Sequence, residues 1–167
     1  MTLTNYLVPG VGRALTLVNF CFQRILRFDS DCRYQKHFTS RVVNSEGLRF
    51  LGQDTAQRRS LAVSGGCYIN SAGGVSIGQG TIWAPNICIL AQEHDRNDIA
   101  VNVDTAPTTI GENCWIGFGA VIMPRVVIGP NTIIGANAVV TRSFPDGNVT
   151  LVGCPARPLV RTKTSEE

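Results

Sequence analysis

The chain contains two histidines, and one of them stands among charged residues where it could do chemistry. His94 lies in the sequence Glu93-His94-Asp95, within a segment that carries many charges and few aliphatic residues. Histidine titrates near neutral pH and is the usual general base, the group that takes a proton from an attacking hydroxyl. Because loops tolerate polar residues of any kind, position alone leaves two interpretations of His94 open, a catalytic base and a solvated loop residue.

The cysteines are the other candidate nucleophiles, and their spacing assigns them no chemistry. They are Cys21, Cys32, Cys67, Cys88, Cys114 and Cys154. No pair has the Cys-x-x-Cys spacing of redox or metal sites, and none lies beside a histidine in the sequence. We therefore predict reduced, mostly structural thiols of a cytosolic protein, and no metal site.

A period of six residues in the second half of the chain predicts the scaffold that positions His94. Branched aliphatic residues recur at Ile110, Ile116, Ile122, Ile128, Ile134 and Val140. Neither a helix, with 3.6 residues per turn, nor an alternating strand explains this period, so a short side must repeat, and three sides close a triangular coil. A parallel α/β sheet would need crossover helices, for which six residues leave no room. The sequence therefore predicts an all-β fold, a parallel β-helix of hexapeptide repeats.

A glycine follows the aliphatic residue in most of these units, as in Ile116-Gly117 and Ile134-Gly135. Glycine tolerates backbone angles that a Cβ atom forbids. This second position of the unit is therefore expected to form the sharp corner of the coil.

Two breaks in the period predict where the coil is interrupted. The interval from Ile69 to Ile77 is eight residues, which predicts a bulge of two residues at one corner. The interval from Ile89 to Ile110 is 21 residues, three more than three sides, and it includes the second histidine. We expect this segment, residues 90–109, to be a loop extruded from the coil, and we call it the histidine loop. Loops on a rigid scaffold commonly carry function.

Residues 12–28 predict an amphipathic helix ahead of the coil. Leu15, Val18, Phe22 and Ile25 share one face, and a narrow polar strip contains Arg13, Thr16, Asn19, Gln23 and Arg27. One interpretation is a helix that packs on the end of the coil or on a neighbouring subunit. The other is a basic amphipathic helix that lies on a membrane surface. The polar segment 53–60 is expected to face solvent.

These patterns divide the chain into a helical segment at 1–36, the coil at 37–153 and a basic tail at 154–167. No apolar run reaches the roughly 20 residues of a membrane span, and no cleavable signal is evident. We therefore expect a cytoplasmic protein, either free or at the inner face of the membrane. The net charge of +3 lacks the basic stripe of a nucleic-acid-binding protein.

The repeat units resemble the left-handed β-helix of the hexapeptide-repeat acyltransferases. Within that family, residues 77–96 resemble the part of the galactoside and maltose acetyltransferases that carries the catalytic histidine, and His94 takes its place. The resemblance implies acetyl-CoA as the acetyl donor and a homotrimer that shares its sites between subunits. It also implies that Asn70 and Asp95 bind the acceptor. Asn70 has a second interpretation, a corner residue that bonds its own backbone.

The resemblance further implies which residues contact acetyl-CoA. Cys114 to Ala120 resembles the W-I-G-x-x-A stretch that lines the acetyl-CoA slot, and Pro155-Ala156-Arg157 resembles the closing element of the family. The expected contacts are Trp115, Gly117, Phe118, Gly119, Gly135, Ala136, Thr141, Arg142 and Arg157. Arg161 and Lys163 could also meet phosphates, unless the tail is a solvated basic segment.

Three residues depart from the family pattern. Arg125 follows Pro124 where relatives commonly carry glycine, so that corner is expected to be strained or to offer a charge to the acceptor. Trp83 stands where a branched aliphatic residue is expected, and Phe118 stands where the family often has a small one. Trp83 and Arg125 could each place the substrate differently from other members, while Phe118 could narrow the slot or stack on the outside.

The leading functional prediction is an O-acetyltransferase that moves an acetyl group from acetyl-CoA to a hydroxyl of a sugar or cell-surface polysaccharide precursor. His94 would act as general base in a direct transfer. Serine or a xenobiotic is the alternative acceptor. A γ-type carbonic anhydrase on the same fold would need three histidine ligands, and a non-catalytic binding β-helix would show flat ranks of repeated outward residues, so both are disfavoured.

Overall fold

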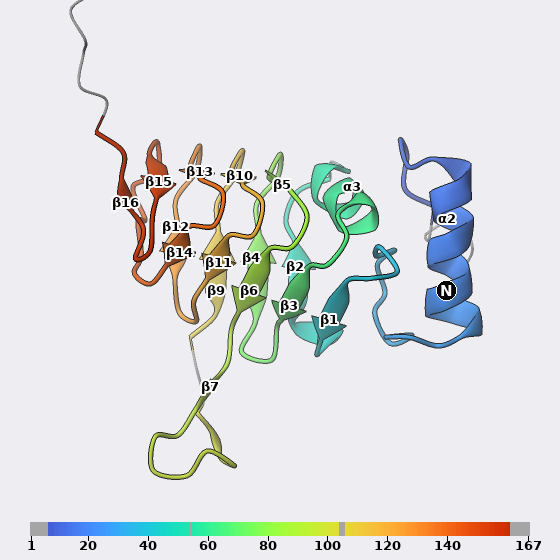
Figure 1. Ribbon diagram of the computed structural model, residues 1–167, viewed down its shortest axis with the longest axis horizontal. Coiled ribbons are helices and arrows are strands. Elements are labelled where there is room, and N and C mark those ends of the chain that lie inside the picture. The colour runs from blue at the N-terminus through green and yellow to red at the C-terminus, as the bar shows by residue number, and fades with distance from the viewer. Residues whose placement is uncertain (1–6, 54, 104–105, 161–167) are drawn as a thin grey trace, which may run out of the picture.

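The computed structural model describes residues 7–53, 55–103 and 106–160, and most of them wind into a three-sided coil of parallel strands (Figure 1). Face 1 contains β1 (Arg41–Val43), β3 (Tyr68–Asn70), β6 (Cys88–Leu90), β11 (Val121–Ile122) and β14 (Val139–Val140). Face 2 contains β2 (Leu48–Phe50), β4 (Val75–Ile77), β9 (Thr108–Ile110) and β12 (Val127–Ile128). Face 3 contains β5 (Ile82–Trp83), β10 (Trp115–Ile116), β13 (Ile133–Ile134), β15 (Thr150–Val152) and β16 (Arg157–Pro158), the last antiparallel to β15. The predicted fold, with the parallel sheets of a left-handed β-helix, is confirmed.

The aliphatic residues of the six-residue period stack inside the coil. Ile116 pairs in register with Ile134, three sides later, and Ile122 pairs with Val140 in the same way. All four side chains are fully buried. Burying such a side chain contributes about 1.5–3 kcal/mol, so the ladder of inward residues is the main source of stability. Trp83 occupies one of these inward places beside Phe50 and therefore does not face a substrate.

The corners of the coil differ from the prediction. The left-handed backbone angle falls on the fourth position of the unit, as at Asn113 (φ 53°) and Asn137 (φ 57°), and not on the second-position glycine. The glycine is required for a different reason. A Cβ atom on Gly117 would lie 2.7 Å from the backbone nitrogen of Ala136 in the next turn. Glycine at this position therefore allows successive turns to stack closely.

The histidine loop leaves the coil as predicted, and it joins two consecutive sides of the coil. Ile77 pairs with Ile110, and Ile89 pairs with Ile122. Ile89 and Ile110 therefore lie on consecutive sides of the coil. The remaining residues form an excursion that contains β7 (Glu93–His94) and β8 (Asn102–Val103), an antiparallel pair that projects from the flank of the coil (Figure 1). Spacing alone cannot distinguish a long excursion from added sides.

The polar segment 53–60 was expected to face solvent, and this holds for the exposed Gln53, Thr55, Arg58 and Arg59 but not for Gln57 and Ser60. It enters α3 (Ala56–Val63), which takes the place of the third side in the first turn of the coil. Gln57 and Ser60 are buried on this helix. The amide of Gln57 donates to the carbonyl oxygens of Leu51 and Gly78, both at 2.9 Å, and so satisfies backbone groups that a strand would otherwise pair.

The N-terminal helix packs on the end of the coil through Asn19 and Gln23 of its polar strip, whereas Arg13 and Arg27 of that strip are exposed. It consists of α2 (Arg13–Phe20), which continues into the π-helical turn η1 (Cys21–Ile25). Asn19 is buried, donates to the carbonyl oxygen of Ala62 at 3.0 Å and accepts from the amide of Phe38 at 2.9 Å. Leu17 and Ile25, in contrast, are more than half exposed. The interpretation that the helix packs on the coil is confirmed, although its apolar face points outward.

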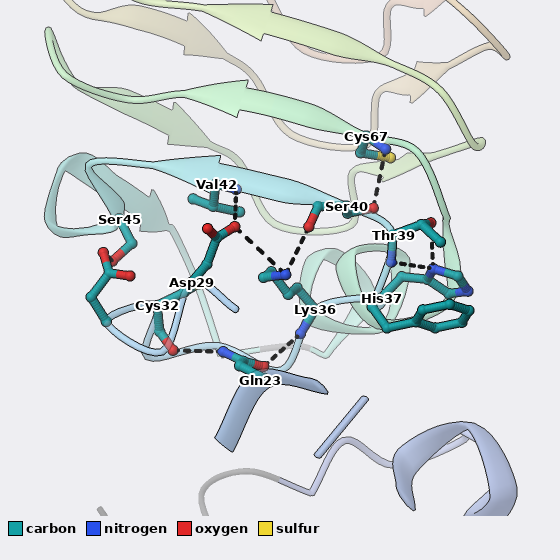
Figure 2. Close-up of polar contacts among 12 residues, drawn as sticks. Gln23, Asp29, Cys32, Lys36, His37, Thr39, Ser40, Val42, Ser45 and Cys67 are labelled. Carbon is teal, nitrogen blue, oxygen red and sulfur yellow. Dashed lines mark hydrogen bonds and ion pairs between the residues drawn. The ribbon is translucent and has the colours of Figure 1, made fainter. Parts of the chain in front are cut away.

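A buried lysine ties the segment between the helix and the coil to the first strand (Figure 2). Lys36 is 2% exposed, and its Nζ donates to the carbonyl oxygen of Ser40 at 2.7 Å and lies 3.6 Å from Asp29 Oδ2. The same carboxylate oxygen accepts from the amide of Val42 in β1 at 3.2 Å. The short 3-10 turn η2 (Ser45–Gly47) then connects β1 to β2.

Replacing Ile134 with Ala should lower the free energy of unfolding by about 2–5 kcal/mol, because it opens a cavity in the aliphatic stack. Ile133→Ala is the matched control, since Ile133 belongs to the same strand but is 39% exposed. It should cost much less. Chemical denaturation of both variants measures the difference, and equal losses would contradict the assignment of inward and outward positions.

Candidate active site

His94 lies on the projecting hairpin with its imidazole exposed. In the hairpin, His94 pairs with Asn102, and Glu93 pairs with Val103. The backbone amide of Asp95 donates to the carbonyl oxygen of Val101 at 2.9 Å and continues this pairing. The hairpin thus holds the histidine backbone while its ring remains free to meet a substrate.

The carboxylate of Asp95 supports the turn of the hairpin. Its Oδ1 accepts from the backbone amides of Asn97 at 2.7 Å and Asp98 at 3.3 Å. Asp98 in turn accepts from the amide of Ala100 at 3.0 Å. These contacts give Asp95 a structural role in the turn. Its predicted role, binding of the acceptor, stays a prediction.

An ion pair joins the base of the hairpin to the next turn of the coil. Arg125 Nη2 lies 2.8 Å from Glu93 Oε2, and both side chains are about half exposed. Arg125 has φ 64°, in the left-handed region. At the fourth position of the neighbouring units this region is occupied by Asn113, Gly119, Asn131 and Asn137. Asparagine and glycine accept such angles readily, whereas a residue like arginine adopts them at a cost.

Asn70 lies one turn before the base of the loop, on the same edge of the coil. It pairs with Leu90, and its carbonyl oxygen accepts from the amide of Ala91 at 2.9 Å. Its side-chain Oδ1 accepts from the amide of Ala72 at 3.2 Å, which is the corner role considered for it. Thr141 and Arg142 follow β14 on this edge, and the Arg142 guanidinium lies 5.0 Å from the Phe144 ring centroid. We call the edge between faces 1 and 2 the loop edge.

The predicted acetyl-CoA residues Trp115 to Gly119, Gly135 and Ala136 lie on another edge, between faces 3 and 1, which we call the glycine edge. Here the amide of Gly117 donates to the carbonyl oxygen of Ile134 at 2.7 Å, and the amide of Asn137 donates to that of Phe118 at 2.8 Å. Phe118 and Ala136 are exposed at these corners. Trp115 lies outward on face 3 in register with Ile82 and Ile133, and it is 53% exposed. Small residues and the exposed Phe118 ring thus lie along this edge, with the Trp115 ring beside it on face 3.

The candidate residues therefore fall on two edges that face 1 separates. Within one chain Asn70, Arg125 and the base of the hairpin that carries His94 all lie at the loop edge, and the glycine edge lies apart from them. The Glu93–Arg125 contact was missed in the sequence. Its signal was the arginine at a corner where asparagine or glycine is usual.

The tail begins on face 3. Arg157 in β16 pairs with Val152, is exposed, and donates from Nη1 to the carbonyl oxygen of Ala156 at 2.9 Å. Arg161 and Lys163, named above as possible phosphate contacts, lie outside the described residues.

The remaining candidate groups lie away from the loop or are buried. His37 Nδ1 is 2.8 Å from Thr39 Oγ1 in the N-terminal junction, its ring stacks on Phe38, and burial lowers its pKa, with a further contribution from the charge of Lys36 (Figure 2). Burial raises the pKa of four cysteine thiols, Cys32, Cys67, Cys88 and Cys114. A raised pKa lowers the fraction of nucleophilic thiolate at neutral pH.

Comparison with known proteins agrees with this architecture. Residues 107–142 match the family model of the bacterial transferase hexapeptide with its six repeats. The second half of the chain therefore carries repeats of this type. The chain is 40% identical to the galactoside O-acetyltransferase of Escherichia coli over 86 residues, which are 50% of this chain and 42% of that protein. Over all, the chain spans about half the length of the curated relatives it matches.

Solved structures extend the similarity. A maltose O-acetyltransferase from Clostridium difficile is 28% identical and superposes with a TM-score of 0.55 over 72% of this chain and 62% of that one. A galactoside acetyltransferase in complex with coenzyme A, 22% identical, shares the fold with a TM-score of 0.59 over 88% of this chain and 78% of that one. The predicted resemblance to hexapeptide-repeat acetyltransferases of the galactoside and maltose type is thereby confirmed.

Replacing Arg125 with Gly should loosen the β7–β8 hairpin without lowering the stability of the protein. Glycine relieves a left-handed strain of about 1–2 kcal/mol, whereas the lost half-exposed ion pair is worth at most about 1 kcal/mol. Thermal stability should therefore hold or rise while amide hydrogen exchange in the β7–β8 hairpin becomes faster. Glu93→Gln, which removes the pair but keeps the strain, should speed exchange without a gain in stability. Unchanged exchange in both variants would show that the ion pair does not hold the hairpin.

Proposed function

We propose that this protein is an O-acetyltransferase that transfers an acetyl group from acetyl-CoA to a hydroxyl of a sugar or cell-surface polysaccharide precursor. The observation that carries the proposal is the exposed imidazole of His94 on a hairpin anchored at the base by Glu93 and Arg125. The similarity to galactoside and maltose O-acetyltransferases supports both the reaction and the class of acceptor.

In the proposed reaction, His94 accepts the proton of the acceptor hydroxyl as its oxygen attacks the thioester carbonyl. The tetrahedral intermediate collapses, the carbon–sulfur bond breaks, and the sulfur of coenzyme A leaves as a thiol with the proton returned from the imidazolium. Donor and acceptor are bound together, and no covalent enzyme intermediate forms. Backbone amides stabilise the negative charge that develops on the carbonyl oxygen.

The glycine edge suits the pantetheine arm of acetyl-CoA. Gly119 and Gly135 are partly exposed and leave the backbone accessible to the amides of that arm, and the exposed Ala136 is small, whereas Gly117 is buried between the turns. Trp115 and Phe118 supply an apolar wall. Arg142 and Arg157 are exposed near the end of the coil, where their guanidinium groups can bond phosphates through paired N–H donors.

A second copy of the chain is needed to complete such a site, because the loop edge and the glycine edge lie apart on one coil. We propose a homotrimer in which the loop edge of one subunit faces the glycine edge of the next. The outward ladder of Ile82, Trp115 and Ile133 on face 3 supports subunit contact, since exposed apolar rows mark interaction surfaces. Sedimentation equilibrium at micromolar concentration should give three subunits, and a stable, active monomer would contradict the shared site.

His94→Asn should reduce the transfer rate by about 10²–10⁴-fold, the usual effect of losing a general base. The fold and acetyl-CoA binding should persist, since the exposed ring supports no buried contact. His37→Asn is the control, and it should change neither the transfer rate nor acetyl-CoA binding. Near-normal turnover of His94→Asn would show that the base lies elsewhere.

Arg157→Ala should raise the Michaelis constant for acetyl-CoA with little change in turnover number. A charge-assisted hydrogen bond to phosphate is worth about 1.5–3 kcal/mol, which corresponds to roughly a tenfold or larger change. Arg49→Ala provides the control, since Arg49 is an exposed arginine on β2 near the other end of the coil. Steady-state kinetics at varied acetyl-CoA would measure both. An unchanged constant in a folded Arg157→Ala variant would identify the tail as solvated surface.

A further inference from the structure

The N-terminal helix presents much of its apolar surface to solvent, although Phe22 packs on Phe38. Asn19 and Gln23 are almost fully buried against the rest of the protein, whereas Leu17, Ile25 and Phe28 are 63%, 64% and 58% exposed. Leu17 also lines an apolar hollow of about 540 Å³ with Val11 and Phe20. Surface helices normally bury their apolar stripe and expose their polar one. The reversed orientation leaves a face that needs another cover.

Buried hydrogen bonds fix this orientation. The side chain of Asn19 pairs with the backbones of Ala62 and Phe38, and that of Gln23 donates to the carbonyl oxygens of Cys32 at 2.8 Å and Tyr34 at 2.9 Å (Figure 2 shows the bond to Cys32). Rotating the helix to bury its apolar face would leave these backbone groups unpaired. A buried polar group without a partner is strongly unfavourable, so the outward apolar surface is built into the fold.

The charge of this segment points to the partner. Residues 1–28 contain three arginines, Arg13, Arg24 and Arg27, and no acidic residue. The rest of the chain has twelve basic and twelve acidic residues, so the whole net charge of +3 lies in this segment. Arg13 and Arg27 are exposed. A second copy docked end to end would place like charges against each other, whereas an anionic lipid surface attracts the arginines.

The position of the helix suits a flat surface. It lies across the end of the coil, far from β16 (Figure 1). Asn19 and Gln23 of its polar strip face the rest of the protein. The apolar face of the helix therefore points away from the coil, and the histidine loop and the flanks stay clear of whatever covers it. No helix among the described residues is long and apolar enough to cross a bilayer.

We propose that the outward face of α2 and η1 binds the surface of an anionic phospholipid bilayer. Leu17, Val18 and Ile25 enter the boundary between headgroups and acyl chains, and Arg13 and Arg27 meet lipid phosphates. Asn19 and Gln23 keep the coil attached to the bound helix. This inference does not depend on the proposed reaction.

Flotation of the full chain with lipid vesicles tests the proposal. The wild type should float with vesicles of phosphatidylglycerol and phosphatidylcholine, bind vesicles of pure phosphatidylcholine at least tenfold less, and be released by salt. Leu17→Asp combined with Ile25→Asp should abolish flotation, and Arg13→Gln combined with Arg27→Gln should weaken it. Leu159→Asp combined with Val160→Asp, two exposed apolar residues at the other end of the coil, is the matched control and should float normally.

Two results would overturn the proposal. The first is failure of the folded wild type to bind anionic vesicles, or equal loss of binding in the control variant. The second is a drop in oligomer mass for Leu17→Asp with Ile25→Asp in light scattering, because it would show that another copy of the chain covers the face. Unchanged circular dichroism confirms that the variants are folded, as expected for substitutions at exposed positions.

Discussion

The stacking of inward aliphatic side chains on successive turns is the interaction on which the rest of the structure depends. Ile116 above Ile134 and Ile122 above Val140 repeat one contact along the coil. Turns can approach this closely because glycine at the second position of the unit leaves room for the next backbone. The left-handed fourth position then redirects the chain into the next side. A change in one turn must therefore preserve the register of its neighbours.

This constraint explains where function can be added to the coil. An insertion at a corner leaves the inward ladder intact, as the pairs Ile77–Ile110 and Ile89–Ile122 show across the histidine loop. The loop is then free to carry polar chemistry on an otherwise apolar scaffold. Arg125 is the complementary case, since an unfavourable backbone angle is kept at the corner where its side chain reaches Glu93. Strain retained at such a place is typical of functional sites.

Much of the fold could be predicted because the inward aliphatic residues of the stack recur every six residues in the sequence. The failures have physical causes of their own. The spacing from Ile89 to Ile110 could not reveal how many sides it contained, because pairing between distant turns decides that number. The polarity of Gln57 and Asn19 suggested exposure, yet both side chains are buried because they satisfy backbone groups at the end of the coil. For the site, the sequence predicted His94 on an extruded loop. It could not show that the glycines and Phe118 predicted to contact acetyl-CoA lie on a different edge while Thr141 and Arg142 lie on the loop edge, since that follows from the order of the three faces.

The central claim is transfer of an acetyl group to a hydroxyl, and product analysis tests it most directly. The wild-type protein would be incubated with acetyl-CoA and one acceptor at a time, chosen from sugars, serine and hydroxyl-bearing antibiotics. The released coenzyme A thiol would be titrated, and the products would be identified by mass spectrometry and NMR. The account predicts one thiol released for each O-acetyl ester formed, with sugars as the best acceptors. Exclusive acetylation of amines, or no acceptor-dependent release of thiol with any hydroxyl compound, would contradict it.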